Sequence, residues 1–353
     1  MKLKPLYLDS AASTPVDPRV KGAMLPYFSE IFGNASSQHI YGKEAKNAIE
    51  TAREHVANLI NAEPEEIYFT SGATEAINWA LKGLMSANPQ LGNHIITVKT
   101  EHRAVLSTCE YLETIGYEIT YLDVDKNGMI SLDDLKSAIK KNTAMIAVMY
   151  VNNEIGIIQD IKGIGGIARE NKICFFCDAT QAIGKVLVDV IDDQIDILCL
   201  SGHKFNGPKG IGALFIKKGI QLTPLIHGGG QENNMRGGTY NTPLIVGLGE
   251  ACRIAEVEFD QRIAHLTLKK EKWENYFISN NIGVVNFSSV KRAPHILSIT
   301  LNAEEADEFL MRKSKEFVAS TGSACSSQIL EESHVIIEIF PNNNHQKTIR
   351  ISI

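Results

Sequence analysis

The sequence predicts an α/β fold in which a mostly parallel β-sheet is covered by helices. From residue 43 onward, segments with helical hydrophobic periodicity alternate with short apolar segments that have strand character. Several apolar segments are hydrophobic on both faces, as expected for strands buried in a parallel sheet. The 353 residues, of which 44% are hydrophobic and 22% charged, are enough to bury a large core without disulfides.

Helices and strands are expected to follow one another in order along the first two thirds of the chain. The expected helices cover residues 43–62, 73–86, 105–116, 131–140 and 161–172. Ser131, followed by acidic residues, marks the start of the fourth helix. The expected strands cover residues 66–70, 94–100, 118–125, 143–151, 173–179, 196–202 and 212–218. This order indicates crossover units, in which a helix connects two parallel strands.

A smaller unit is expected in the C-terminal third. A long helical region runs from about Pro243 to Phe277, and a helix is expected at 303–314. Strands of a smaller sheet are expected at 295–301, 316–322 and 348–353. We therefore expect a large domain over residues 15–257 and a small α+β domain formed by residues 1–14 and 258–353.

Composition and charge exclude several classes of protein. The formal net charge of −6 and the absence of a basic block argue against direct binding to nucleic acid. No apolar stretch approaches the roughly 20 residues that a membrane-spanning helix needs. Asp9 interrupts the N-terminal segment, so we expect no signal peptide. Six scattered cysteines without an export signal are typical of reduced thiols, and we expect a cytoplasmic protein.

Two motif-like segments are rejected as binding sites. Cys174 and Cys177 have the spacing of redox or metal motifs, but within an apolar strand residues three apart face opposite sides. The segment GIGGIA, residues 163–168, matches a dinucleotide-binding pattern loosely but lies inside an expected helix. We therefore expect two buried cysteines that do not cooperate, no nucleotide site in this helix, and no metal site.

Lys204 lies in the segment SGHKFNGPKG, directly after the strand expected at 196–202. Ligands gather at the carboxyl ends of parallel strands, and a partly desolvated lysine at such a place can form a Schiff base. Ser201 and His203 beside it are suited to hold an anion such as a phosphate. The alternative is a surface lysine in a strand–turn–strand hairpin.

Three further segments place polar groups at expected strand ends. Asp178 can pair with a protonated pyridinium nitrogen, or it serves only as a helix N-cap. His102 can stack on a flat cofactor or carry a proton, although a lone histidine is usually structural. Residues 71–74, Ser-Gly-Ala-Thr, open a helix whose free backbone N–H groups suit a phosphate, although serine and threonine open many helices.

Cys325 lies in the segment STGSACSS, residues 320–327, among small and polar residues. A buried core cysteine normally has large apolar neighbours, and a disulfide requires a partner cysteine. Neither is present nearby in the sequence. These surroundings are typical of an exposed, reactive thiol on a loop.

Taken together, SGHKFNGPKG and TGSAC resemble the class V aminotransferase-like enzymes that use pyridoxal 5′-phosphate (PLP), and among these the NifS/IscS-like cysteine desulfurases. The resemblance runs from YLDSAASTPVDPRV at 7–20 to TIRISI at 348–353. It implies the PLP-dependent transferase fold (fold type I, aspartate aminotransferase-like), with a mostly parallel seven-stranded sheet and a smaller α+β domain. It also implies PLP as cofactor and a homodimer with shared active sites.

The resemblance implies a role for each matching residue. Lys204 would carry PLP and move a proton, His102 would stack on the ring, and Cys325 would be the persulfide-forming nucleophile. Asp178 would hold the pyridinium N–H, and Arg350 would clamp the substrate carboxylate in a bidentate manner. The implied cofactor contacts are Ala73, Thr74, His102, Asn153, Asp178, Gln181, Ser201, His203, Lys204 and, from the other subunit, Thr239. Asn153 and Arg350 are the implied substrate contacts.

The implied reaction converts L-cysteine and an acceptor thiol to L-alanine and a persulfide, which passes to an acceptor protein. Iron–sulfur cluster assembly, tRNA thiolation and DNA phosphorothioation all remain open as destinations of the sulfur. One alternative is another PLP reaction on the same fold, either transamination or selenocysteine lysis. A second is a weakly active protein that binds and regulates sulfur-transfer partners. It is motivated by the chain's end three residues after Arg350, where the family usually continues, so Arg350 is expected to be poorly held.

Overall fold

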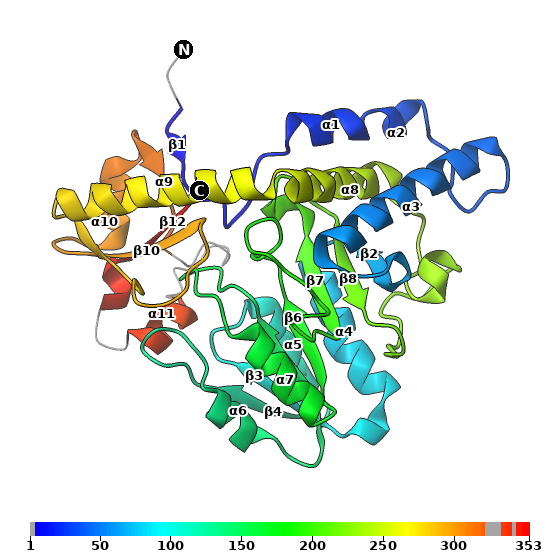
Figure 1. Cartoon of the computed structure of the whole chain (residues 1–353), viewed down its shortest axis with the longest axis horizontal. Helices are drawn as coiled ribbons and strands as arrows, with labels where there is room; N and C mark the ends of the chain where they lie inside the picture. Colours follow the sequence, from blue (N-terminus) through cyan, green and yellow to red (C-terminus); the bar gives the residue numbers. More distant parts are fainter. Residues whose placement is uncertain (1–3, 322–332, 341–343) are drawn as a thin grey trace.

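A seven-stranded β-sheet forms the centre of the larger part of the molecule (Figure 1). The computed structural model describes residues 4–321, 333–340 and 344–353. The strands, in the spatial order β2-β8-β7-β6-β5-β3-β4, are β2 Ile67–Thr70, β3 His94–Val98, β4 Glu118–Leu122, β5 Thr143–Met149, β6 Cys174–Asp178, β7 Ile197–Ser201 and β8 Gly212–Ile216. Every strand of the predicted large sheet is present, and the predicted α/β fold is confirmed.

Six of the seven strands run in the same direction. β4, β3, β5, β6 and β7 are parallel neighbours, whereas β8 is antiparallel to both β7 and β2, so β2 runs in the same direction as β7. The carboxyl ends of these six strands therefore share one edge of the sheet. Residues that directly follow these strands collect at that edge, where ligands of such sheets are usually bound.

Helices cover both faces of this sheet and bury its apolar side chains. The helices are α1 Pro18–Met24, α2 Pro26–Ser29, α3 Ile40–Ile60, α4 Ala73–Ala87, α5 Arg103–Thr114, α6 Leu132–Ala138, α7 Ile161–Glu170 and α8 Thr242–Val257. One core cluster contains residues of α3, α7 and α8, and a second, on the other face, contains residues of α4 and α5. Cys177 belongs to the first cluster and Cys174 to the second, so the prediction that they face opposite sides is confirmed. The GIGGIA segment lies inside α7, as predicted.

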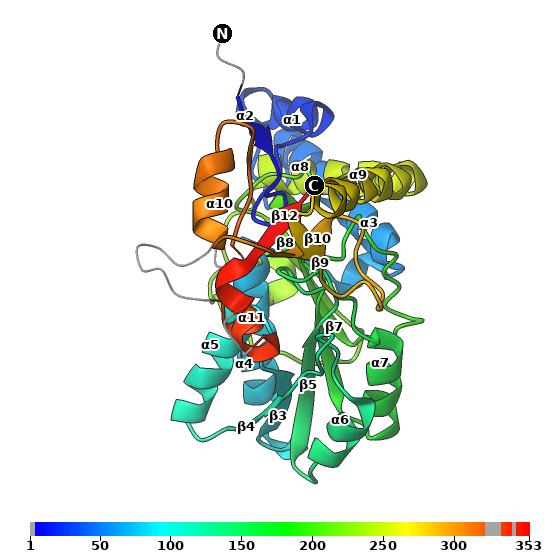
Figure 2. The ribbon, with the colours of Figure 1, turned by 90° about the vertical axis from the view of Figure 1, so that its left-hand side faces the viewer.

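The smaller part contains both chain ends and its own core (Figures 1 and 2). Its elements are β1 Leu6–Tyr7, α9 Phe259–Ser279, β9 Gly283–Val285, β10 Ile296–Leu301, α10 Ala306–Lys313, β11 Phe317–Val318, α11 His334–Ile339 and β12 Thr348–Ser352. The 3-10 helices of the chain are η1 Pro64–Glu66, η2 Pro89–Leu91, η3 Gly202–Lys204, η4 Gln231–Asn234 and η5 Asn344–Lys347. Among the described residues, no helix combines the length and apolar character of a membrane span.

The structure corrects one expectation for this part and refines another. The segment expected as a strand at 316–322 does not join one small sheet: β11 covers two of its residues and pairs with β1, while β12, β10 and β9 form a separate antiparallel sheet. The long helical region expected from about Pro243 to Phe277 is present as two helices, α8 and α9, separated at Glu258, which has φ −100° and ψ 13°. The apolar pattern continues across that residue and gives no sign of the break.

Candidate active site

The polar residues predicted at strand ends meet at the carboxyl edge of the large sheet. Asp178 is the last residue of β6, Lys204 ends η3 directly after β7, and His102 is the N-cap of α5 after β3. They lie close enough for the charges of Asp178 and Lys204 both to act on the pKa of His102. The expected gathering of these three residues is thus present in the structure.

The side chain of Lys204 points inward against the N-terminal segment. Its Nζ donates to the carbonyl oxygens of Ala11 at 2.8 Å and Ala12 at 3.0 Å. Thr14 fixes the same segment, because its Oγ1 donates to the carbonyl of His203 at 2.8 Å. The connection from β7 to β8 joins antiparallel strands, as the hairpin alternative requires, but Lys204 is a partly buried, hydrogen-bonded lysine within it.

Asp178 is buried and uses only one carboxylate oxygen for the fold. Its Oδ1 accepts from the backbone N–H of Thr180 at 2.9 Å and from the thiol of Cys199 at 3.4 Å. The alternative capping role is therefore real, although it caps a turn and no α-helix. Among the described residues no hydrogen bond reaches Oδ2, so this oxygen can accept from a ligand such as a pyridinium N–H.

His102 is a mostly buried, neutral imidazole. Its Nδ1 accepts from the backbone N–H of Ala104 at 3.1 Å, which places the ring proton on Nε2. Burial lowers the pKa of His102, Asp178 opposes that effect, and Lys204 adds to it. The residue has the structural role of an N-cap and also presents a flat, uncharged ring to the site.

The start of α4 forms a cradle for an anion. Gly72, the N-cap, has φ +148°, a conformation that L side chains rarely adopt, and no side chain caps the first turn formed by Ala73 and Thr74. A Cβ on Gly72 would lie 3.6 Å from Ser201 Oγ, so that hydroxyl faces the same space. Free N–H groups at the start of a 15-residue helix, with a hydroxyl beside them, suit a phosphate.

His203, two residues after Ser201, contacts the N-terminal segment. Its Nδ1 lies 3.2 Å from Ser13 Oγ, which leaves Nε2 for a ligand. Burial, with the neighbouring charge of Lys204 and two further lysines, lowers the pKa of His203 to about 4. The ring is therefore neutral at physiological pH, and it contributes a hydrogen bond without a charge.

Arg350 and Asn153 lie together. Arg350 Nη1 donates to the carbonyl of Asn153 at 2.9 Å, and Nη2 forms an ion pair with Asp9 at 2.7 Å. Its Nε is buried and has no partner among the described residues. The expectation that Arg350 is poorly held is wrong, because its backbone pairs with Ser298 of β10 and with Ser320.

Two predicted residues are not placed in this group. Thr239 is exposed and lines a cavity of about 410 Å³ together with Tyr27 of α2 and Phe32. Cys325 lies outside the described residues. Their predicted roles stay predictions.

The structure adds buried carboxyl groups that sequence reasoning missed. Glu101 Oε1 accepts from the backbone N–H of Met149 at 2.5 Å, and burial together with the nearby Asp178 raises the pKa of Glu101 well above its usual value. Glu154 accepts from the Ser333 hydroxyl, and burial raises the pKa of Glu154 to about 7. Glu101 could have been found from the sequence, because it directly precedes His102. No sequence pattern indicates that the carbonyls of Ala11 and Ala12 contact Lys204.

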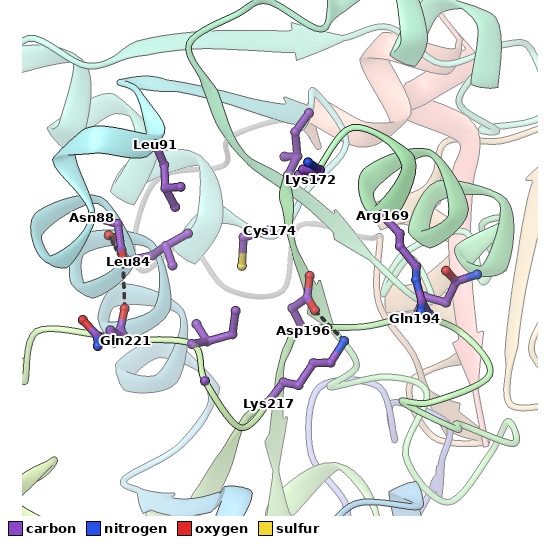
Figure 3. Close-up of a pocket in the computed structure, with 13 residues that line it drawn as sticks. Leu84, Asn88, Leu91, Arg169, Lys172, Cys174, Gln194, Asp196, Lys217 and Gln221 are labelled. Atoms are coloured by element: carbon purple, nitrogen blue, oxygen red, sulfur yellow. Dashed lines mark hydrogen bonds and ion pairs between the residues drawn. The ribbon is translucent and has the colours of Figure 1, made fainter.

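A separate cavity of about 370 Å³ lies at the other end of the sheet (Figure 3). It is lined by Cys174, the first residue of β6, and by an ion pair between Lys217 and Asp196 at 3.0 Å. No predicted site residue lines this cavity. It is therefore distinct from the site at the carboxyl edge.

Comparison with known proteins gives consistent results. The family described as Aminotransferase class-V matches residues 6–353. The chain is 50% identical over 339 residues to the cysteine desulfurase IscS of Neisseria meningitidis serogroup C (strain 053442), covering 94% of this chain and 83% of that protein. It is similar to the structure of a NifS-like protein, with a TM-score of 0.91, 34% identity, and coverage of 99% and 93% of the two chains. A structure described as SspA in complex with cysteine has a TM-score of 0.86, 40% identity, and coverage of 99% and 98%.

Proposed function

The chain belongs to the class V aminotransferase family and is a cysteine desulfurase; on this premise we propose that it holds PLP at the carboxyl edge of the seven-stranded sheet and passes sulfur from L-cysteine to Cys325. The observation that supports the position is the meeting of Lys204, Asp178 and His102 at this edge. The available Asp178 Oδ2 and the uncapped start of α4 fit the ring nitrogen and the phosphate of PLP.

In this proposal, each group of residues holds one part of the cofactor. Lys204 would hold its aldehyde carbon, Asp178 would accept from the ring N–H, and His102 would pack against the ring. Gln181 and Asn153 would serve the ring oxygen and the substrate side. The phosphate would be held by Ala73, Thr74, Ser201 and His203, and by Thr239 of a second subunit. Bound there, PLP supplies an electron sink that stabilises negative charge at the substrate Cα.

The residues of this chain perform the steps around that sink. Arg350 would bind the substrate carboxylate through guanidinium donors other than the two that contact Asn153 and Asp9. Lys204 removes the Cα proton and later returns a proton to the carbon fragment, which leaves as L-alanine. The Cys325 thiolate attacks the substrate sulfur, so an S–S bond forms as the C–S bond breaks and its electron pair stays with carbon.

The finer features of assembly belong to the same proposal. We expect a homodimer, because Phe32 is 69% exposed and lines the cavity that also contains Thr239. We expect the persulfide to pass to an acceptor protein. The division into residues 15–257 and residues 1–14 with 258–353 is supported by the helix break at Glu258 and by a core cluster that lies wholly within the smaller unit, although Ala11, Ala293 and Ile296 join the large core. The cytoplasmic location stays a prediction from the cysteine usage.

The test measures alanine and sulfide released from purified, PLP-loaded protein given L-cysteine and excess dithiothreitol. We expect equal amounts of both products, and their loss in Cys325→Ala. Cys252→Ala, which alters a fully buried thiol of α8, is the matched control and should retain activity. Activity that survives in Cys325→Ala would point to transamination, and a wide preference for selenocysteine would point to selenocysteine lysis. Bound PLP without alanine formation would favour the weakly active regulatory alternative.

A further inference from the structure

Behind Gln181 lies a cluster of buried polar side chains that the mechanism above does not use. Lys185 is only 5% exposed and His295 is fully buried. Lys185 Nζ lies 3.4 Å from Gln181 Oε1, and His295 Nε2 lies 3.2 Å from the same oxygen. On its other side, Gln181 Nε2 donates to the carbonyl of Ala11 at 2.8 Å, which also accepts from Lys204.

The cluster joins the two parts of the molecule at the candidate site. Gln181 and Lys185 belong to the turn after β6, which Asp178 ends, whereas His295 directly precedes β10 of the smaller part. The backbone N–H of Ile353 donates to the carbonyl of His295 at 2.9 Å, so the histidine is fixed by the C-terminal strand as well. The side chains of Lys185, from the same turn, and His295, from a distant segment, therefore meet at the amide of Gln181.

The hydrogen bonds determine the orientation of that amide. A backbone carbonyl can only accept, so Gln181 must turn its Nε2 toward Ala11 and its Oε1 toward Lys185 and His295. Both of these side chains must then donate. Burial, with the charges of Lys185, Arg350 and Lys270, lowers the pKa of His295 well below its usual value, so the ring is neutral. Its one proton is on Nε2, in agreement with a buried Nδ1 that has no partner among the described residues.

Lys185 can donate in either protonation state. Burial, followed by the charges of Lys204 and Arg262, lowers the pKa of Lys185 well below its usual value. Gln181 Oε1 is the hydrogen-bond acceptor that the described residues offer to its Nζ. Burying an amine costs free energy, so Lys185 contributes little to the stability of the core. Its effect is instead to hold the one amide oxygen to which it donates.

On the premise of the proposed function, we propose that Lys185 and His295 are positioning residues that lock the Gln181 amide with its N–H groups toward the cofactor site. One Nε2 hydrogen is used by Ala11, and the second would be available to an oxygen anion of the bound cofactor. Loss of either donor to Oε1 weakens the hold on that side of the amide, which is then fixed mainly by Ala11, and its second N–H is less firmly directed to that anion. The reaction requires no new step, since these residues act only through Gln181.

The pH at which the absorption of bound PLP changes reports this hydrogen bond. A donor to the ring oxygen stabilises the deprotonated form of the cofactor, so losing it raises the midpoint. We expect Lys185→Met and His295→Leu each to raise the midpoint by about one pH unit, which is a tenfold change in the equilibrium. Lys185→Gln retains a donor without the charge and should titrate like the unaltered protein. His94→Leu is the control, because His94, the first residue of β3, is equally buried but forms hydrogen bonds with Thr143 and Thr120.

A second background separates the hydrogen bond from a direct effect of charge. In a Gln181→Met protein, Lys185→Met should cause no further shift if it acts through the amide. Equal midpoints for the unaltered protein, Lys185→Met and His295→Leu, with PLP bound and circular dichroism unchanged, would overturn the proposal. The proposal would also be overturned if Lys185→Met shifted the pH midpoint fully in the Gln181→Met background, or if Lys185→Gln shifted it in the unaltered background. A protein that binds no PLP at all would instead remove the proposed function and this inference with it.

Discussion

Replacing Asp178 by asparagine isolates the charge that the cofactor ring requires. Asparagine has the same shape, and its side-chain oxygen can still accept from the backbone N–H of Thr180, now 2.9 Å from Oδ1. The substitution removes one negative charge from a residue that is 5% exposed. It also relieves the repulsion with Glu101 that raises the pKa of the glutamate. The fold should therefore tolerate the change, whereas the chemistry should not.

The expected magnitudes differ for stability and for activity. One hydrogen bond is weakened and one repulsion is relieved, so the free energy of unfolding should change by no more than about 1 kcal/mol. A preorganised charge at the reacting group is worth far more: removing one such electrostatic contact costs about 10²- to 10³-fold in kcat. We expect a loss of that size in alanine formation, with PLP still bound.

Alanine formation is the assay, with bound PLP measured by its absorption and stability by urea unfolding. Asp193→Asn is the matched control, because Asp193 is also buried and accepts from Tyr150 at 3.0 Å but is not among the candidate site residues. The control should keep its activity. Activity of Asp178→Asn within about threefold of the unaltered protein at full PLP occupancy would refute the assignment of Asp178, since the expected loss is at least about 10²-fold.

Three further predictions concern the cradle, the carboxylate clamp and pH. Gly72→Ala should weaken PLP binding about tenfold or more in a dissociation assay, because strain at φ +148° disturbs the cradle by about 1–3 kcal/mol. Gly116→Ala, with φ +94° and open space around it, should lose stability but keep its PLP affinity. Arg350→Lys should raise the KM for L-cysteine at least about tenfold through loss of bidentate contact, whereas Arg312→Lys at the surface should not. The pKa of Glu154 is raised to about 7 in the folded state. Between about pH 4.5 and pH 7 the folded protein therefore binds more protons than the unfolded chain, and the free energy of unfolding falls as pH rises. Glu154→Gln should flatten this dependence in urea unfolding at pH 5 and pH 7.5, by up to about 3 kcal/mol, and an unchanged slope would contradict the raised pKa.

The central sheet and its ligand-binding edge could be predicted because both depend on local pattern. Asp178, His102 and Lys204 each come directly after an apolar run, and a parallel sheet brings such positions together. The antiparallel direction of β8 could not be predicted, since an apolar run does not encode strand direction. The break at Glu258 could not be predicted either, because the hydrophobic period is preserved on both sides of it.

The supporting residues could not be predicted, because only tertiary structure brings them together. His295 and Gln181 are 114 residues apart and share no motif. The carbonyl of Ala11 contacts Lys204 because the N-terminal segment crosses the site. No periodicity in the sequence indicates this crossing. Arg350 is held by strand pairing with β10 and by Asp9, and this removes the structural reason for expecting a weakened clamp.

The most direct test of the account locates the lysine that carries the cofactor. Borohydride reduction of the PLP-loaded protein fixes the cofactor to the amine that holds it, and peptide mapping by mass spectrometry then identifies the residue. We expect modification of Lys204, at about one cofactor per chain, and its loss in Lys204→Ala. Modification at the neighbouring buried Lys185, or at no single lysine, would contradict the site described at the carboxyl edge of the sheet.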